Sequence, residues 1–211
     1  MTNIYMTPDK LPTRDRLLQI GYEVMEKKGW SLERVPGIGK SSVRRLVRGG
    51  ESKLVSFKTT QDQWLAFSRT GDDKAWSTLQ DVDAVVVISV DDCESPRHAN
   101  VHFIDKADLL PRFDRAYAAR KGAGHTIPVG RGVWISLYDD EKTSPINLIG
   151  AGAGNVFPPI AKVPLAERQE EAKPGHKTPV EEGPLTIPEA KRRLALTFGV
   201  DPTAIKISVE G

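Results

Sequence analysis

The 211-residue sequence has one cysteine, Cys93, no apolar run long enough to span a bilayer, and a formal net charge of only +2. A single cysteine excludes a disulfide framework within the chain. A membrane-spanning helix needs about 20 consecutive apolar residues. The small net charge excludes a global field that attracts DNA or an anionic membrane. The first twelve residues lack the basic-then-apolar pattern of a signal peptide, so we expect a cytoplasmic protein.

Hydrophobic periodicity predicts an α/β core domain over residues 13–138, with a mixed β-sheet flanked by helices. Residues 84–90 are almost wholly apolar and β-branched, which predicts a central strand buried on both faces, with residues 100–104 beside it. Residues 42–48 fit either a strand or a helix. We expect helices over residues 13–28 and 105–121, a last strand over 133–138, and a hairpin of 53–59 with 64–67.

Outside this core the sequence predicts three further parts. Residues 1–12 are interpreted as a flexible arm, and residues 139–184 as a disordered linker, because glycines, prolines and charges interrupt any apolar period. Residues 185–211 are expected to form a small helix–strand tail, with an alternating strand over 205–209. One helix and one strand cannot bury enough surface alone. The tail is therefore expected to dock on the core, on a second copy or on a protein partner.

Positive charge is concentrated in one segment. Between Arg34 and Lys58, seven basic residues face one acidic residue, Glu51. Such a cluster can neutralise several phosphates, which is the electrostatic part of nucleic-acid binding. The alternative is a solvated basic face that balances the acidic run of residues 72–94. The expected contact residues are Arg34, Lys40, Arg44, Arg45, Arg48, Lys53 and Lys58.

Neighbouring residues add to this nucleic-acid hypothesis. Trp64 and Phe67 would provide base stacking, and residues 59–61 would provide hydrogen bonds to phosphates. Arg131 lies between Gly130 and Gly132, which predicts either an anion contact or a turn with a surface arginine. Arg131 therefore joins the expected contact residues.

Two short motifs in the basic segment have known relatives. Residues 35–40, Val-Pro-Gly-Ile-Gly-Lys, resemble the turn of helix-hairpin-helix DNA-binding motifs, which implies backbone N–H groups aimed at a phosphate. An ordinary glycine-rich turn that leads into a strand is the alternative. Gly39-Lys40-Ser41 also resembles the end of a Walker loop, but Arg34 occupies the position of its first glycine.

The expected order of elements, a helix, several strands, a helix and a strand, resembles the core of restriction-endonuclease-like (PD-(D/E)xK) nucleases. In that family a strand carries a carboxylate that binds Mg²⁺, one spacer residue and a lysine. Here the strand has Ser56-Phe57-Lys58, so the lysine position is filled and the carboxylate position is a serine. The resemblance implies DNA binding. Cleavage would require a migrated carboxylate, for which Glu33 and Asp62 are the candidates.

Other chemistry is less well supported. The segment from Asp91 to His102 offers carboxylates, Cys93 and two histidines, but no spacing typical of a metal site. Cys93 with His98 or His125 lacks any motif of a nucleophile and its base. The sequence therefore predicts a non-catalytic nucleic-acid-binding domain, most simply for DNA, with no cofactor and no metal. A protein–protein adaptor and a Mg²⁺-dependent nuclease are the alternatives.

Overall fold

The computed structural model describes residues 11–35, 42–165, 186–198 and 201–207. The chain divides into two units, Met1–Arg168 and Gln169–Gly211, which are described separately. The turn expected to resemble a helix-hairpin-helix motif, residues 35–40, lies outside the described residues except for Val35. Lys40 therefore lies outside them too. So do residues 1–10 of the expected arm, whereas Leu11 and Pro12 already belong to the first helix.

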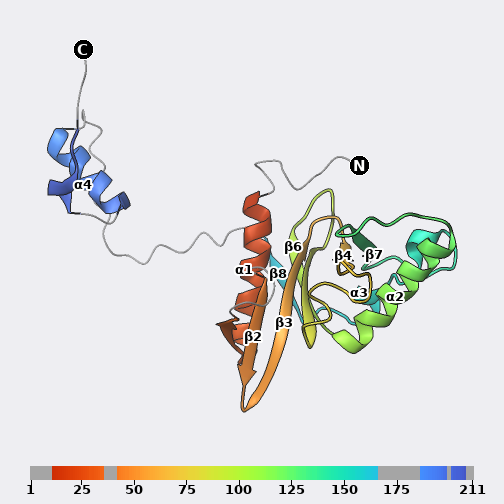
Figure 1. The fold of residues 1–211 in the computed structure, drawn as a ribbon. Helices are drawn as coiled ribbons and strands as arrows, with labels where there is room; N and C mark the ends of the chain where they lie inside the picture. The colour runs from red at the N-terminus through yellow and green to blue at the C-terminus, as the bar shows by residue number, and fades with distance from the viewer. Residues whose placement is uncertain (1–10, 36–41, 166–185, 199–200, 208–211) are drawn as a thin grey trace. The chain divides into compact units, whose positions relative to one another are not determined.

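The larger unit is built on one mixed six-stranded sheet of order β1-β2-β3-β5-β6-β8 (Figure 1). Strands β3 and β5 are parallel, and every other neighbouring pair is antiparallel. The predicted α/β class, with a mixed sheet around residues 84–90, is confirmed. The strands are β1 (Ser31–Arg34), β2 (Val43–Arg48), β3 (Glu51–Thr60), β5 (Ala84–Val90), β6 (His98–Asp105) and β8 (Ala161–Pro164).

Helix α1 (Leu11–Lys27) covers one face of this sheet. Its residues Leu17, Ile20 and Val24 recur at helical spacing and pack against Val86 and Ile88 of β5. The helix approaches the sheet closely at Gly21, where a Cβ atom would lie 2.7 Å from Cδ1 of Ile88. A larger residue at the crossing point would force the Ile88 side chain to move.

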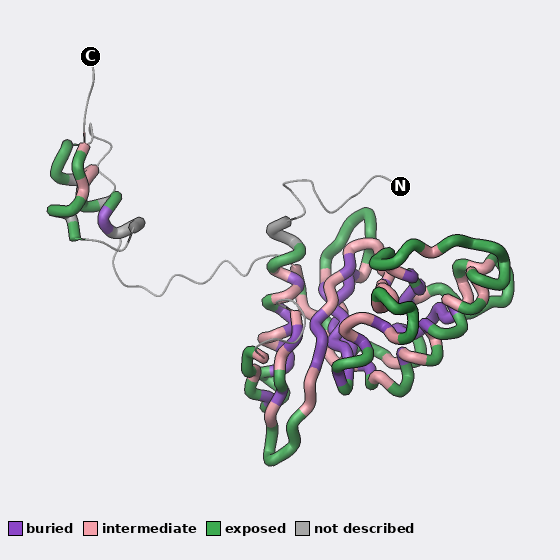
Figure 2. The backbone as a smooth tube through the Cα atoms, viewed as in Figure 1, coloured by how far each residue is buried: buried purple, intermediate pink, exposed green. Residues whose placement is uncertain are grey.

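A second layer covers the opposite face. It consists of a two-stranded antiparallel sheet, β4 (Trp64–Ser68) with β7 (Gly132–Ser136), and of helix α2 (Lys106–Gly122). Leu65, Val133 and Phe113 from these elements pack against Val85 and Val87 of β5. Since both faces of β5 are covered, all seven of its residues are buried, as its almost wholly apolar sequence predicted (Figure 2).

The expected hairpin of residues 53–59 with 64–67 is wrong. β3 pairs instead with β2 and β5, and β4 leaves the main sheet to pair with β7. Two parallel strands need a crossover over one face of the sheet, and β4 belongs to that crossover. The true hairpin joins β2 to β3 through Gly49 and Gly50, whose φ angles of 56° and 87° suit a tight two-residue turn.

The expected linker at 139–184 is also wrong over its described part, residues 139–165. This segment contains the 3₁₀ turn η2 (Ile146–Leu148), helix α3 (Ala153–Val156) and strand β8, which pairs with β6. Gly150 and Gly152 adopt φ angles of 83° and 82° in buried turns. The glycines that indicated flexibility are thus needed for tight packing. The rest of the expected linker, residues 166–184, lies outside the described residues.

The smaller unit contains helix α4 (Ile187–Phe198) and the short turn η3 (Pro202–Ala204). The expected helix is confirmed. The expected strand over 205–209 is not present at Ile205 to Ile207, and the remainder lies outside the described residues. In neither unit does the described part of the chain include a helix with the length and apolar content to cross a membrane.

Candidate nucleic-acid interface

The expected contact residues lie mainly on three neighbouring strands, β1, β2 and β3. We call their side chains the basic ribbon. Side chains alternate between the two faces of a strand, and directly paired residues share a face. The cross-strand register therefore assigns each residue to a face of the sheet. The basic ribbon comprises Arg34, Arg44, Arg45, Arg48, Lys53 and Lys58.

Four of these residues lie on the face that α1 covers, namely Arg34, Arg44, Arg48 and Lys53. Arg44 and Arg48 share this face with the buried Leu46, which packs in the α1 core. Arg34 pairs directly with Arg44 across β1 and β2. Two like charges directly opposite each other cost folding free energy. The pairing of these two arginines is therefore a charge arrangement that an anionic ligand would stabilise.

Aromatic rings orient two of the guanidinium groups. Arg44 lies 5.2 Å from the ring centre of Tyr22, and Arg48 lies 4.2 Å from that of Trp30. Arg48 also donates to the carbonyl oxygen of Lys28 at 3.3 Å and lies 3.8 Å from a carboxylate oxygen of Glu51. Both arginines are thus held close to the sheet.

Lys53 has two acidic neighbours. Its Nζ atom lies 3.5 Å from Glu51 and 3.6 Å from Asp105, and also 5.5 Å from the ring centre of Phe103. These carboxylates balance its charge, so Lys53 contributes less positive potential than the arginines on β2.

Arg45 and Lys58 lie on the opposite face of the sheet. Arg45 is exposed and donates to Oγ of Ser52 at 3.3 Å. Lys58 is half-buried, with Nζ 4.6 Å from the ring centre of Phe67. The basic ribbon therefore has cationic side chains on both faces, with its charge divided between them.

The nuclease-like position contains a buried serine. Ser56 is fully buried, and its Oγ has no hydrogen-bond partner in the described part of the chain. Ser56 therefore does not face solvent. Of the two candidate migrated carboxylates, Glu33 is exposed opposite Arg45, and Asp62 accepts hydrogen bonds from Oγ of Thr60 (2.7 Å) and from the N–H of Trp64 (3.1 Å). Asp62 thereby braces the turn into β4.

The structure also bears on the helix-hairpin-helix resemblance and on Arg131. The helix that a helix-hairpin-helix motif requires after its turn is absent, because residues 43–48 form β2. Arg131 is exposed in the turn before β7, where its N–H donates to the carbonyl of Pro128 at 3.0 Å. It does not belong to the basic ribbon.

Of the aromatic residues expected to stack on bases, only Trp64 is accessible. Phe67 is 2% exposed and belongs to the core, whereas Trp64 is half-buried on the outer face of β4. Sequence reasoning missed Trp134, which is 40% exposed on β7. The alternation of residues 133–137 contained the signal, because Trp134 lies between the inward residues Val133 and Ile135.

A buried polar cluster lies between β5, β6 and the segment after β7. Nδ1 of His102 donates to the carbonyl of Phe157 at 2.7 Å, and its Nε2 accepts from the hydroxyl of Tyr138 at 2.8 Å. The Tyr138 hydroxyl also contacts Oγ of Ser89 at 2.5 Å and accepts from Nδ2 of Asn100 at 3.3 Å. Burial lowers the pKa of His102, so its ring is neutral. His102 is wholly enclosed, and the cluster joins strands rather than forming an open site.

The candidates for metal or thiol chemistry have other roles. Asp91 accepts hydrogen bonds from the N–H groups of Arg97 and His98 and from Nδ1 of His98, all within 3.0 Å. These bonds close the β5–β6 hairpin and outweigh desolvation, so the pKa of Asp91 is well below its usual value. Burial and nearby carboxylates raise the pKa of the Cys93 thiol, which opposes a nucleophilic role. Among the described residues no group of three potential ligands converges on one point.

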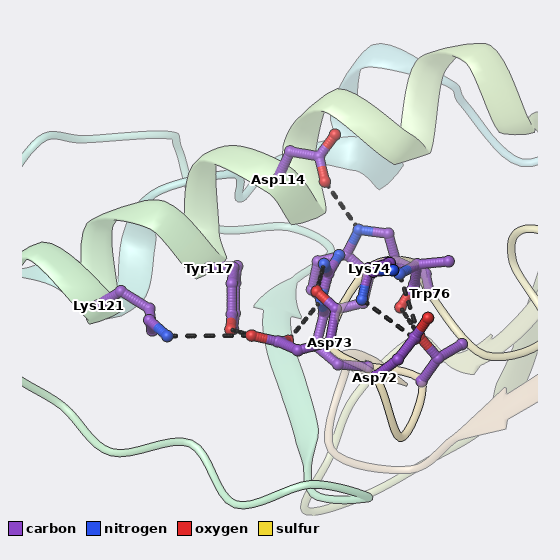
Figure 3. Close-up of polar contacts among 10 residues, drawn as sticks. Asp72, Asp73, Lys74, Trp76, Asp114, Tyr117 and Lys121 are labelled. Carbon is purple, nitrogen blue, oxygen red and sulfur yellow. Dashed lines mark hydrogen bonds and ion pairs between the residues drawn. The ribbon is translucent and has the colours of Figure 1, made fainter.

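The loop between β4 and β5 is fixed to α2 by a compact set of contacts (Figure 3). Asp73 accepts from the hydroxyl of Tyr117 at 2.5 Å and pairs with Arg69, whose guanidinium lies 4.9 Å from the ring centres of both Trp76 and Tyr117. Nε1 of Trp76 donates to Asp114 at 2.8 Å. Every cation here has an acidic partner or a ring, so this set is interpreted as structural.

Comparisons with known proteins identify no relative. No family model matches the chain, and neither the curated proteins nor the solved structures contain a significant match.

Proposed function

We propose that this chain binds nucleic acid, with DNA as the expected ligand, through the basic ribbon and without a catalytic role. The observation that carries the proposal is the direct pairing of Arg34 with Arg44, together with Arg45 on the reverse face of the same strand. Like charges directly opposite each other on two strands lower stability, and a bound anion would offset that cost. Phosphate oxygens supply that charge, and guanidinium groups bind them in a two-pronged geometry.

The shape of the β2–β3 hairpin supports the same ligand. Its tip, around Gly49 and Gly50, extends beyond the body of the unit and is exposed (Figures 1 and 2). β1 pairs with β2 as far as Val47, so the projecting part has three strands, and some DNA-binding proteins place strands of a sheet in a groove of DNA. Arg45 and Arg48 lie near this tip and are exposed. Arg45 is the better placed of the two to reach a phosphate, because Arg48 lies over the ring of Trp30 and near Glu51.

Binding without cleavage follows from the chemistry of the nuclease-like strand. The element order α1, β1 to β6, α2 and β7 is the order on which the resemblance to restriction-endonuclease-like nucleases rests, and it favours a DNA ligand. Ser56 occupies the position of the metal-binding carboxylate, and a buried serine hydroxyl does not replace a carboxylate as a Mg²⁺ ligand. The proposal is therefore a nuclease-like scaffold used for binding.

A gel-shift titration with a labelled duplex and a labelled single strand, with and without Mg²⁺, tests the proposal. The wild-type chain is expected to retard at least one probe without cutting it, with affinity that falls steeply as salt rises. The triple variant R44A/R45A/R48A should bind at least about tenfold more weakly at any sequence. The control variant K74A/R97A/K142A removes as many exposed charges outside the ribbon and should bind like the wild type.

The remaining outcomes decide between the alternatives. Mg²⁺-dependent cleavage would replace the proposal with a nuclease that uses a migrated carboxylate. No retardation of either probe would leave the adaptor function, for which α4 is the relevant element because Ile187 and Leu194 are 58% and 38% exposed. Such exposed apolar residues on an amphipathic helix suit a protein partner or a second copy.

A further inference from the structure

The outer face of the β4–β7 sheet presents two tryptophans with small residues between them. In the register of this sheet Trp64 pairs with Ser136, Ala66 with Trp134, and Ser68 with Gly132. The residues between these positions, such as Leu65 and Val133, point into the core. The outer face therefore consists of Trp64, Ala66, Ser68, Gly132 and Trp134, with Ser136 buried at its end, and we call it the tryptophan face.

The indole of Trp134 lies along the sheet. A Cβ atom added at Gly132 would lie 3.4 Å from Nε1 of Trp134 and 3.2 Å from Cβ of Ala66. The ring thus extends over the bare backbone of Gly132, and its outward side remains open, in agreement with an exposure of 40%. Neither Trp64 nor Trp134 contacts another aromatic ring in the described part of the chain. A flat, open indole is suited to stacking.

The spacing of the two tryptophans suits consecutive bases. Trp64 and Trp134 are diagonal neighbours across an antiparallel pair, a relationship that places Cβ atoms about 7 Å apart. Successive bases in a strand are separated by roughly 3.4 Å when stacked and by more when the strand is extended. Two indoles at this distance can therefore contact neighbouring bases of one unpaired strand.

Two arginines lie near Trp134 of the tryptophan face. The guanidinium of Arg120 donates to the carbonyl of Trp134 at 2.7 Å, and Arg131 lies three residues before Trp134 in an exposed turn. An aromatic surface with cations at its edge matches the stacking and backbone contacts of single-strand binding.

We infer that the tryptophan face stacks unpaired nucleobases, so that the ligand of this chain includes single-stranded nucleic acid. The inference rests on the proposed function and specifies its substrate class. The basic ribbon supplies contacts to phosphates that any nucleic acid offers, whereas the tryptophan face discriminates in favour of bases that are not paired, because paired bases have no free face to offer.

Fluorescence anisotropy with a labelled 20-nucleotide single strand and the matching blunt duplex provides the test. W134A is expected to lower affinity for the single strand by about 5- to 100-fold, the range that corresponds to one lost stack, and to leave affinity for the duplex unchanged. W134F keeps an aromatic face and should bind the single strand within about threefold of the wild type. V156A removes another exposed apolar side chain and should have no effect.

Intrinsic fluorescence gives an independent readout. Trp30 and Trp76 are 7% and 1% exposed, so quenching by an unlabelled single strand should come mainly from Trp64 and Trp134 and should fall in W134F. If W134A binds the single strand like the wild type, the tryptophan face is not the stacking site and the proposed function stands. Equal losses for both probes with a lower melting temperature would also overturn the inference. If the wild type binds neither probe, the proposed function itself is wrong.

Discussion

Nδ1 of His102 donates a hydrogen bond to the main-chain carbonyl of Phe157, 2.7 Å away. This bond joins β6, which lies between β5 and β8 in the main sheet, to the residue that follows α3. It fixes the tautomer of the ring, because a carbonyl can only accept, and so leaves Nε2 to accept from Tyr138. The stability of the fold is thereby linked to the protonation state of one buried side chain.

We expect the free energy of unfolding to fall as the pH is lowered below about 6.5. Burial lowers the pKa of His102 in the folded chain from its ordinary 6.5, so below pH 6.5 the unfolded chain binds a proton that the folded chain does not. The contribution is fully present above pH 6.5 and is lost progressively below it. Urea unfolding at pH 7.5, 6.5 and 5.5 measures how steeply the free energy of unfolding depends on pH.

H102Q should lower the free energy of unfolding at pH 7.5 by about 1–3 kcal/mol and reduce the slope of its pH dependence. H125Q, at an exposed site, should preserve the slope, and an unchanged slope in H102Q would rule out His102 as its source.

A chain that ends at Tyr138 should fail to fold, whereas a chain that ends at Arg168 should fold. The shorter chain loses β8, the Phe157 carbonyl and the buried Gly150–Gly154 segment, and so exposes the edge of β6 and leaves the His102 ring without its acceptor. The longer chain retains the whole first unit. Circular dichroism and the dispersion of amide proton shifts in an NMR spectrum show whether each chain is folded. A cooperatively folded 1–138 fragment would contradict the structural role assigned to residues 139–165.

The substitution G150A should destabilise the fold by about 2–4 kcal/mol. Gly150 has a φ of 83°, and an added Cβ would collide with the main-chain carbonyl oxygen of Arg112 in α2. The left-handed conformation alone costs roughly 1–2 kcal/mol for alanine, and a backbone atom cannot move aside cheaply. G124A is the matched control, because Gly124 has a φ of 79° and open space around it. Equal losses in the two variants, measured by chemical denaturation, would show that strain alone acts at Gly150.

Within the basic ribbon, R45A should weaken nucleic-acid binding more than K53A does. Arg45 is exposed and bonded to the neutral Ser52, whereas Lys53 lies within 3.6 Å of two carboxylates. Removing Lys53 also removes less positive potential, because Glu51 and Asp105 remain. We expect the loss of affinity in R45A to exceed that in K53A about fivefold or more at low salt, and this difference to narrow as salt rises. Anisotropy titrations of both variants at about 50 and 200 mM salt measure these losses. A larger loss in K53A than in R45A would contradict the prediction.

K58M should leave the melting temperature within about 3 °C of the wild type and weaken binding to both probes. The methionine retains the stem of Lys58 over the Phe67 ring and removes the charge. Thermal melts and the same titrations measure the two effects. Unchanged binding would exclude Lys58 from the contact surface, and loss of a Mg²⁺-dependent cleavage in this variant alone would favour the nuclease alternative.

By itself the sequence determined the elements whose signal is local. The stripe Leu17, Ile20, Val24 predicted α1, and the almost wholly apolar run of residues 84–90 predicted a strand covered on both faces. The concentration of basic residues between Arg34 and Lys58 was equally visible, although residues 42–48 fitted either a strand or a helix. These features follow from side-chain periodicity and backbone preference within a few residues.

Only the tertiary structure decided how distant segments pair. The partner of β4 proved to be β7, more than sixty residues away, and that pairing alone places Trp64 and Trp134 on one face. Glycines 150 and 152, which indicated a linker, sit in buried turns against α2 and the chain after β7. The same glycine-rich composition fits a mobile segment and a tightly packed one, because what distinguishes them is the surface against which the backbone packs, and that surface comes from residues far away in the chain.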